Sequence, residues 1–298
     1  TATARTLTWP SSINWDGGSA PTLDQTNFSG TDFQQFQLLT RDEGVTWYGW
    51  ETMSNSTATY KLWAWGDNSE GQLGLNNTTQ YSSPVQVGSS ADWSFVSRIS
   101  GGNDSGAKVL TATKTDGTLW TWGMNYFGQG AQNNETKYSS PVQVPGTTWK
   151  QSATTGFSQG LKTDGTLWAW GSGTSGQLGQ NSLGHKSSPV QIPGTWKKTG
   201  QADYNAFGIR TDGTLWSWGY NYYGSLGLNQ APAASGTRYS SPVQVGSDTT
   251  WSDVGGNQSY AGGLKTDGTL WTWGNGGNGA IGNNTAVHYS SPVQIPGT

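Results

Sequence analysis

The sequence contains no cysteine, only two histidines and only four glutamates among its 298 residues. The lack of cysteine excludes disulfides, thiolate zinc sites and cysteine nucleophiles, and it leaves the redox compartment open. None of the glutamates stands at a spacing that suggests an acid/base pair, so we assign no catalytic residue. We therefore expect a protein that is not an enzyme and that needs no metal ion or cofactor.

Long apolar runs and clusters of basic residues are also missing. No stretch reaches the about 18 apolar residues that a membrane-spanning helix needs, which predicts no membrane insertion. The net charge is −3 and the basic residues stand singly, whereas nucleic-acid binding needs clustered positive charge. No charged-then-apolar signal segment stands at the start. Because the chain begins at Thr1 and not with methionine, we expect a processed, truncated or partial product.

Glycine and tryptophan are abundant, with 45 and 18 residues, and much of both falls into five copies of one pattern. Each copy reads Leu-Trp-x-Trp-Gly, then a glycine-rich stretch, then Ser-Ser-Pro-Val-Gln. The second tryptophan and the proline are 19 residues apart in four copies and 24 residues apart in the fourth along the chain. A period of roughly 50 residues is typical of units that bury their apolar faces only against neighbouring units.

Each unit is expected to consist of strands. Four copies carry Thr-Asp-Gly-Thr before the tryptophans, and Asp-Gly between strand-like runs predicts a type I′ hairpin turn, in which both central residues have positive φ. These four aspartates, Asp116, Asp164, Asp212 and Asp267, are therefore interpreted as turn formers. Along the next strand both tryptophans share one face. We predict that this face forms the structural core, built from Trp63, Trp65, Trp120, Trp122, Trp168, Trp170, Trp216, Trp218, Trp271 and Trp273.

The two histidines occupy one position of the repeat. His185 and His288 each precede a proline by four residues, where the other copies have Gln80, Lys137 and Arg238. A position that accepts such different polar side chains indicates a solvated loop and not a pair of metal ligands.

The block from Trp65 to Val87 resembles the regulator of chromosome condensation repeat, because Trp-Gly-Asp-Asn-Ser-Glu-Gly-Gln-Leu-Gly-Leu is followed by Ser-Ser-Pro-Val-Gln-Val. Four later copies are similar, so the resemblance covers about residues 60–298. It implies an all-β fold, a β-propeller of about five to seven four-stranded blades around a central axis. Founding members of that family have seven blades and act on small GTPases and chromatin. Only five units are clear here and no basic tail is present, so exchange-factor activity does not carry over.

The N-terminal segment has a different character. Residues 5–52 resemble a segment common in bacteriophage tail-fibre and tail-structural proteins, through Trp9-Pro10, residues 16–22, Asp32-Phe33 and residues 40–49. We assign residues 1–52 to an N-terminal β segment and residues 53–298 to the propeller. The segment is either a small module docked on the propeller, which we favour, or a degenerate first blade.

Candidate binding residues lie where the copies differ, directly after each Trp-Gly, because the shared residues are used for folding. The second and fourth copies place aromatic residues beside asparagine there, and such pairs suit sugar rings or the apolar edge of a protein. The predicted ligand-binding residues are Asn125, Tyr126, Phe127, Tyr220, Asn221, Tyr222 and Tyr223. The alternative is that the tyrosines only cover neighbouring backbone. Two insertions, at residues 101–106 and 231–236, are the second choice for a recognition surface.

These observations favour a non-enzymatic binding protein on a virion or cell surface, of the kind found as tail-fibre adhesins, host-recognition proteins or decoration proteins. The expected partner is a host surface glycan or a neighbouring virion or structural protein, with no nucleic acid, and the chain could form homo-oligomers. One alternative is a purely structural spacer in a fibre or particle. A polysaccharide-active enzyme is less favoured, because no histidine or paired-carboxylate cluster is present.

Overall fold

A computed structural model of the chain describes residues 34–40, 46–53, 60–99, 108–230 and 237–297. Within these residues the regular structure is almost entirely strand, and the two exceptions are the short 3-10 helices η1 (Tyr222–Gly224) and η2 (Gly277–Gly279). The strands form five antiparallel four-stranded sheets, one of which gains a fifth, parallel strand. The predicted all-β propeller of four-stranded blades is confirmed.

Each sheet is one blade, and its strands follow one another in chain order. The first blade contains β1 (Gln34–Thr40), β2 (Thr46–Met53), β3 (Leu62–Gly66) and β4 (Tyr81–Gln86). The second contains β5 (Trp93–Val96), β7 (Val109–Lys114), β8 (Leu119–Gly123) and β9 (Tyr138–Gln143). The third contains β10 (Trp149–Thr154), β11 (Phe157–Lys162), β12 (Leu167–Gly171) and β13 (Lys186–Ile192). The fourth contains β14 (Trp196–Gln201), β15 (Asn205–Arg210), β16 (Leu215–Asn221) and β17 (Thr237–Gln244), and the fifth contains β18 (Trp251–Gly256), β19 (Tyr260–Lys265), β20 (Leu270–Gly274) and β21 (Tyr289–Gln294).

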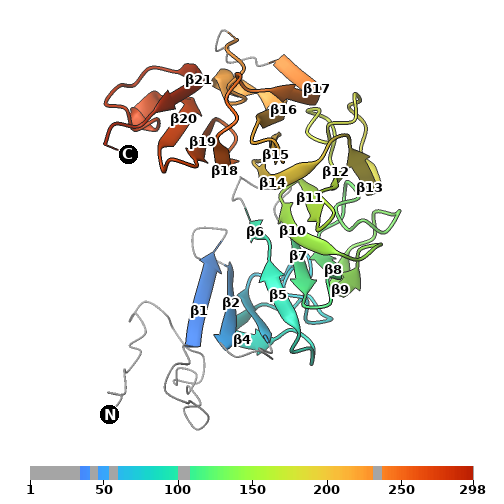
Figure 1. The fold of residues 1–298 in the computed structure, drawn as a ribbon. Coiled ribbons are helices and arrows are strands. Elements are labelled where there is room, and N and C mark those ends of the chain that lie inside the picture. The colour runs from blue at the N-terminus through green and yellow to red at the C-terminus, as the bar shows by residue number, and fades with distance from the viewer. Residues whose placement is uncertain (1–33, 41–45, 54–59, 100–107, 231–236, 298) are drawn as a thin grey trace, which may run out of the picture.

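The five blades follow one another along an arc, with the first and fifth blades at its two ends (Figure 1). The first strands of successive units lie on the inner side, where β10 contacts β14 and β14 contacts β18. The short strand β6 (Arg98–Ile99) follows β5 in the chain but pairs in parallel with β10 of the third blade. This pairing ties the second blade to the third near the inside of the arc.

The hydrophobic core lies between the blades and not within them. We call the side of a blade that carries the leucine of Leu-Trp-x-Trp-Gly its trailing face, and the side that carries the second tryptophan its leading face. In the third interface, Phe157 and Leu167 of one trailing face pack against Trp196 and Trp218 of the next leading face. In each of the other three interfaces the leucine of one blade likewise packs against two tryptophans of the next. A blade therefore buries its apolar surface only when a neighbour covers it.

The Asp-Gly turns differ from the predicted type. In the third blade the backbone N–H of Gly165 donates to the carbonyl of Lys162 at 3.1 Å, and only the glycine has a positive φ, of 82°. The Asp164 carboxylate instead accepts the backbone N–H and the hydroxyl of Thr166, at 2.9 and 2.7 Å. The result is a three-residue hairpin loop, a tight turn followed by a glycine bulge, and not type I′. The pKa of Asp164 is lowered by the backbone and hydroxyl hydrogen bonds of that threonine.

Part of the N-terminal segment belongs to the first blade. β2 pairs along its length with β1 on one side and with β3 on the other, so residues 34–40 and 46–53 extend the sheet that contains the first Leu-Trp-x-Trp-Gly. This arrangement differs from the separate module that we favoured. The rest of the segment that resembles tail-fibre proteins, at residues 5–33 and 41–45, lies outside the described residues.

Candidate binding surface

Each third strand ends in Trp-Gly, and the glycine turns the chain into the loop that varies between blades. These glycines have φ values between 95° and 104° in all five blades. At Gly123 an added Cβ would lie 2.1 Å from the carbonyl oxygen of Lys108, so only glycine fits. The following loops touch one another across blade boundaries. We call them together the loop face: residues 67–80, 124–137, 172–185, 220–230 with 237–238, and 275–288.

A buried asparagine braces this loop in three blades, at Asn68, Asn125 and Asn221. The Oδ1 atom of each accepts the backbone N–H five residues further along the chain, at 2.7–3.0 Å. The amide nitrogen of Asn125 also donates to the carbonyls of Asn134 and Thr136, at 3.0 and 2.9 Å. Asn125 and Asn221, which we predicted to bind a ligand, thus brace their loops, whereas the predicted aromatic residues are partly or largely exposed.

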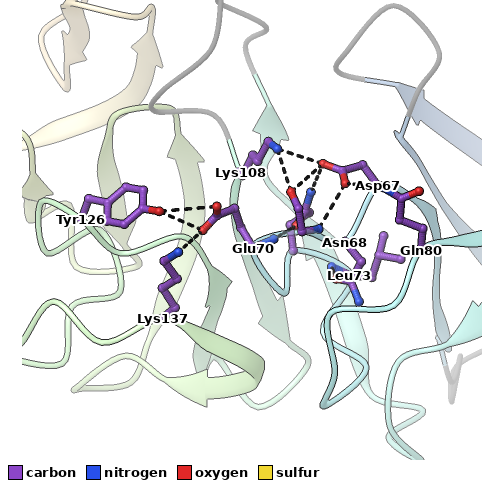
Figure 2. Close-up of polar contacts among 10 residues, drawn as sticks. Asp67, Asn68, Glu70, Leu73, Gln80, Lys108, Tyr126 and Lys137 are labelled. Atoms are coloured by element: carbon purple, nitrogen blue, oxygen red, sulfur yellow. Dashed lines mark hydrogen bonds and ion pairs between the residues drawn. The ribbon is translucent and has the colours of Figure 1, made fainter.

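Between the first and second blades the loop face is charged (Figure 2). Lys108 Nζ lies 2.9 Å from Asp67 Oδ2, and Lys137 Nζ lies 2.6 Å from Glu70 Oε2. The Tyr126 hydroxyl points to the Glu70 carboxylate at 3.4 Å, and the ring is 47% exposed. Partial burial raises the pKa of Asp67, but hydrogen bonds from Lys108 and from the loop backbone outweigh it and lower the pKa to about 2. Tyr126 thus lies at the edge of two ion pairs, Lys108–Asp67 and Lys137–Glu70, whose charges balance.

Between the fourth and fifth blades the loop face is aromatic. The rings of Tyr220 and Tyr222 are stacked with centroids 5.9 Å apart, and Tyr222 and Tyr223 follow at 4.3 Å. Tyr223 also contacts the ring of His288 from the fifth blade at 4.8 Å. We call these four residues the aromatic cluster, and the guanidinium of Arg238 lies 5.7 Å from the ring of Tyr220 at its margin. All four rings remain partly exposed.

The backbone of Tyr223 is in the left-handed region, with φ 53°. This conformation is uncommon for a bulky side chain and costs about 1–3 kcal/mol. Asn278 occupies the same position of the fifth blade with φ 57°, so the last two blades share this conformation, while the tyrosine belongs to the fourth copy alone. Hydrogen bonding with Tyr223 raises the pKa of Tyr222, so the Tyr222 phenol stays protonated at neutral pH.

Phe127 stacks on His185 of the next blade, with ring centroids 4.9 Å apart. The Nδ1 atom of His185 accepts the backbone N–H of Gly173 at 3.3 Å, and Nδ1 of His288 accepts that of Gly276 at 3.0 Å. The histidines therefore do more than occupy a solvated loop: each closes its own loop and covers an aromatic residue of the preceding blade. Lys137 holds the same repeat position and contacts the loop of the first blade through Glu70.

The single basic residues also have a shared role that the sequence analysis missed. One lies between two tryptophan rings in each of the last four blades, with its charged group 3.7–5.2 Å from the ring centroids. These residues are Lys114, Lys162, Arg210 and Lys265. The sequence signal that could have revealed this role is their shared position, two residues before the aspartate of each Asp-Gly. They stabilise the blades by cation–π interactions and do not form a basic surface.

The described residues hold no group of three or more histidine, cysteine, aspartate or glutamate side chains placed to bind a metal ion. In the same part of the chain, no helix is long and apolar enough to cross a membrane. The two insertions, at residues 101–106 and 231–236, lie outside the described residues. Of the predicted binding residues, Tyr220, Tyr222 and Tyr223 come together in one cluster, while Tyr126 and Phe127 contact different neighbours.

The family model for the regulator of chromosome condensation (RCC1) repeat matches residues 61–107, 164–198, 212–260 and 267–298, which together are more than half of the chain. The chain belongs to the RCC1-repeat family. Its RCC1 repeats are similar to the ultraviolet-B receptor UVR8 of Arabidopsis thaliana, with 33% identity over 96 residues. They are also similar to the RCC2 homolog of Danio rerio, with 36% identity over 76 residues. The matched segments cover 32% and 26% of this chain and 21% and 14% of those proteins.

Solved structures show the same fold at low identity. Yeast RCC1 (Prp20) bound to Kap60 superposes with a TM-score of 0.66 at 16% identity, covering 84% of this chain and 59% of that one. Human WBSCR16 superposes with a TM-score of 0.64 at 18% identity, and the match covers 83% of this chain and 64% of WBSCR16. Prp20p of Saccharomyces cerevisiae superposes with a TM-score of 0.67 at 16% identity, and the match covers 84% of this chain and 61% of Prp20p. The structure of Prp20p was described together with its binding to Gsp1p and histones. The chain thus spans less than two thirds of these proteins, and its RCC1-type propeller supports a binding or regulatory protein.

Proposed function

We propose that the protein is a non-enzymatic adhesin that binds its target through the aromatic cluster, at a virion or cell surface. The observation that carries this proposal is the stack of three tyrosines and His288, which lie 4.3–5.9 Å apart and remain partly open to solvent. Exposed aromatic rings held in a fixed arrangement lose little conformational entropy on binding, which is why tyrosine is frequent in binding sites.

A surface glycan is the ligand class that this chemistry fits. The apolar faces of sugar rings stack on aromatic rings, and sugar hydroxyls bond to the phenol hydroxyls and the guanidinium of Arg238 at the margin of the cluster. The resemblance of residues 5–52 to tail-fibre segments supports placing the protein on a virion or cell surface, as a tail-fibre-like adhesin or decoration protein. No catalytic group is needed for this role.

A protein partner is the second candidate. The solved relatives include one bound to Kap60 and one described with its binding to Gsp1p and histones, so propellers of this family offer surfaces for proteins. The ion-pair group around Tyr126, with Lys108 and Lys137 beside Asp67 and Glu70, is the part of the loop face that suits such a partner.

The test compares the wild-type chain with a variant that carries Tyr220→Ser, Tyr222→Thr and Tyr223→Asn. Each new residue occurs at the same loop position in another blade of this chain, so the loop is expected to keep its shape. The matched control carries Tyr126→Thr and Phe127→Ser on the second blade. Both variants and the wild type are measured on a glycan array and on whole cells, with thermal unfolding recorded in parallel.

We expect the wild type and the control to bind one class of glycan, and the triple variant to lose at least tenfold in affinity, since removing aromatic contacts worth more than about 1.4 kcal/mol weakens binding by that factor. If the wild type binds cells, if no free sugar inhibits this binding, and if only the control variant loses it, the result would favour the protein partner. Equal binding by all three chains would overturn the assignment to the aromatic cluster. No binding by a folded wild type would favour the structural spacer.

A further inference from the structure

Tyr204 is an exposed aromatic residue that lies next to the aromatic cluster but is not part of it. It stands in the hairpin between β14 and β15 and is 41% exposed. Its carbonyl accepts the backbone N–H of Tyr220 at 3.0 Å, one step beyond the paired residues Asn205 and Gly219. Residues that face each other in this way on antiparallel strands have Cα atoms about 5.5 Å apart. Tyr204 is therefore the direct neighbour of Tyr220 across the blade.

Arg238 is the neighbour of Tyr220 on the other side. β16 pairs with β17 so that Tyr220 lies opposite Arg238, and the guanidinium is 5.7 Å from the tyrosine ring. Residues directly opposite one another on adjacent strands are neighbours on one face of a sheet. Tyr204, Tyr220 and Arg238 thus form a line across the loop ends of β15, β16 and β17, which we call the cross-strand row. Two strand spacings make this row about 10 Å long, longer than a single sugar ring.

The hairpin that carries Tyr204 is held in a fixed shape. The backbone N–H of Ala202 donates to the carbonyl of Asn205 at 2.9 Å and closes the hairpin. The hydroxyl of Thr155 in the third blade donates to the carbonyl of Ala202 at 3.4 Å, and Nε2 of Gln201 donates to that hydroxyl at 2.8 Å. Thr155 and Gln201 are both buried. An aromatic side chain on such a braced hairpin loses little conformational entropy when it binds a ligand.

The tyrosine in this hairpin belongs to the fourth blade alone among the blades whose hairpins the structure describes. In the second, third and fifth blades a carbonyl accepts the N–H of the first loop residue in the same way, but it belongs to Lys108, Gly156 and Ser259. A position that accepts lysine, glycine or serine is not required for the fold, so the tyrosine there is available for binding. The fourth blade therefore differs from the other blades in both of its neighbouring loops, and both differences add tyrosine.

Arg238 carries a positive charge that has no acidic partner within the described part of the chain. At the same repeat position, Lys137 pairs with Glu70 of the preceding blade at 2.6 Å. The residue of the third blade that corresponds to Glu70 is Ser175, which has no charge to offer. Arg238 is also exposed. An exposed guanidinium beside an aromatic ring suits a carboxylate or phosphate, which it binds through two parallel N–H groups.

We infer that the cross-strand row extends the binding site, so that the protein binds a chain of sugars bearing an acidic group and not a single neutral sugar. This inference rests on the proposed function, because the row joins the aromatic cluster at Tyr220. One sugar ring stacks on Tyr220 and the next on Tyr204, while the carboxylate or phosphate of the chain pairs with Arg238. Stacking on the two tyrosines selects chain length, and the guanidinium selects negative charge.

The experiment uses variants built from residues that this chain already has at the same repeat positions. Tyr204→Ser introduces the residue of the fifth blade, Ser259, and Arg238→Gln introduces that of the first blade, Gln80. The second-blade control and the triple variant of the aromatic cluster are measured beside them. The probes are monosaccharides, disaccharides and tetrasaccharides with a carboxylate or a phosphate, each paired with its neutral methyl ester or its dephosphorylated form. Affinities come from isothermal titration, and thermal unfolding shows that each variant is folded.

We expect the wild type and the control to bind one kind of acidic tetrasaccharide at least tenfold more tightly than its neutral form; whether that is the carboxylate or the phosphate chain identifies the acidic group. Arg238→Gln is expected to bind the acidic and neutral forms equally. Tyr204→Ser is expected to bind the tetrasaccharide about five- to tenfold more weakly than the wild type, with unchanged affinity for the monosaccharide.

Two results would overturn the inference and leave the proposed function in place. One is equal binding of acidic and neutral probes by the wild type, or a preference for the acidic form that survives in Arg238→Gln. The other is wild-type affinity of Tyr204→Ser for every chain length. In both cases the proposed function stands if the triple variant of the aromatic cluster loses glycan binding. No binding of any sugar by the folded wild type would overturn the inference and the proposed function together.

Discussion

The substitution Trp170→Phe tests whether the indole contacts between blades hold the propeller together. Trp170 is fully buried, and its Nε1 donates to the backbone carbonyl of Gln129 in the preceding blade at 2.8 Å. Losing this donor leaves a buried carbonyl without its partner, which costs about 1–3 kcal/mol. Phenylalanine is also smaller than tryptophan by roughly 40 Å³, which adds about 1 kcal/mol at 24 cal/mol per Å³ of cavity. We expect a loss of about 2–4 kcal/mol in the free energy of unfolding.

The matched control is Trp65→Phe, which changes the same residue type in the first blade. Trp65 is half-buried, and the described residues contain no blade before the first one, so we expect this change to cost less than about 1 kcal/mol. Urea unfolding followed by tryptophan fluorescence gives both values from the midpoint and slope. Equal losses in the two variants would refute the reasoning, because the indole-to-carbonyl contacts would then add nothing to the packing within a blade.

Three further substitutions test other parts of the account. Lys162→Met keeps the hydrocarbon stem but removes the charge between two indole rings, and a loss of about 1 kcal/mol in urea unfolding is expected; no loss would mean that the ring contacts are incidental. The pKa of Asp248 is lowered to about 2, chiefly by Lys265, so its contribution is complete above about pH 4 and disappears as the pH falls towards 2. Asp248→Asn should therefore flatten the stability profile between pH 4 and 2 by less than about 1 kcal/mol, because the pair is partly exposed, and an unchanged profile would contradict this. Gly176→Ala, which meets the next blade, should cost about 1–3 kcal/mol more than Gly279→Ala, which meets open space; equal melting temperatures of the two variants would contradict the interface geometry.

The repetition in the sequence was sufficient to predict the blades. Five copies of Leu-Trp-x-Trp-Gly, each followed by Ser-Ser-Pro, define third and fourth strands whose alternation fixes the two faces of each sheet. The turn type was not predictable from Asp-Gly alone, because the Asp164 side chain accepts two hydrogen bonds from Thr166 and selects a longer loop. Residues 34–53 could not be assigned to the first blade from the sequence because they lack the repeated motif, and only the pairing of β2 with β3 places them there.

The position of the variable loops was predictable from the sequence, but the contacts that their residues make were not. Variation after Trp-Gly identified the loops, yet it could not separate residues that face solvent from residues that brace the loop. Asn125 and Tyr126 are neighbours in sequence, but the first is buried and the second is 47% exposed. Contacts between blades were also not predictable from the sequence, because Phe127 contacts His185 and Tyr223 contacts His288 only when two repeats pack side by side. The repeat length alone does not give that stacking register.

The most direct test of the central claim is an isothermal titration of the leading glycan from the array into the wild-type chain and into the triple variant of Tyr220, Tyr222 and Tyr223. The account predicts saturable binding to the wild type, with a negative heat-capacity change from the buried aromatic surface, and at least tenfold weaker binding to the triple variant at unchanged thermal stability. The same Kd for both chains would contradict the claim that the aromatic cluster is the binding site.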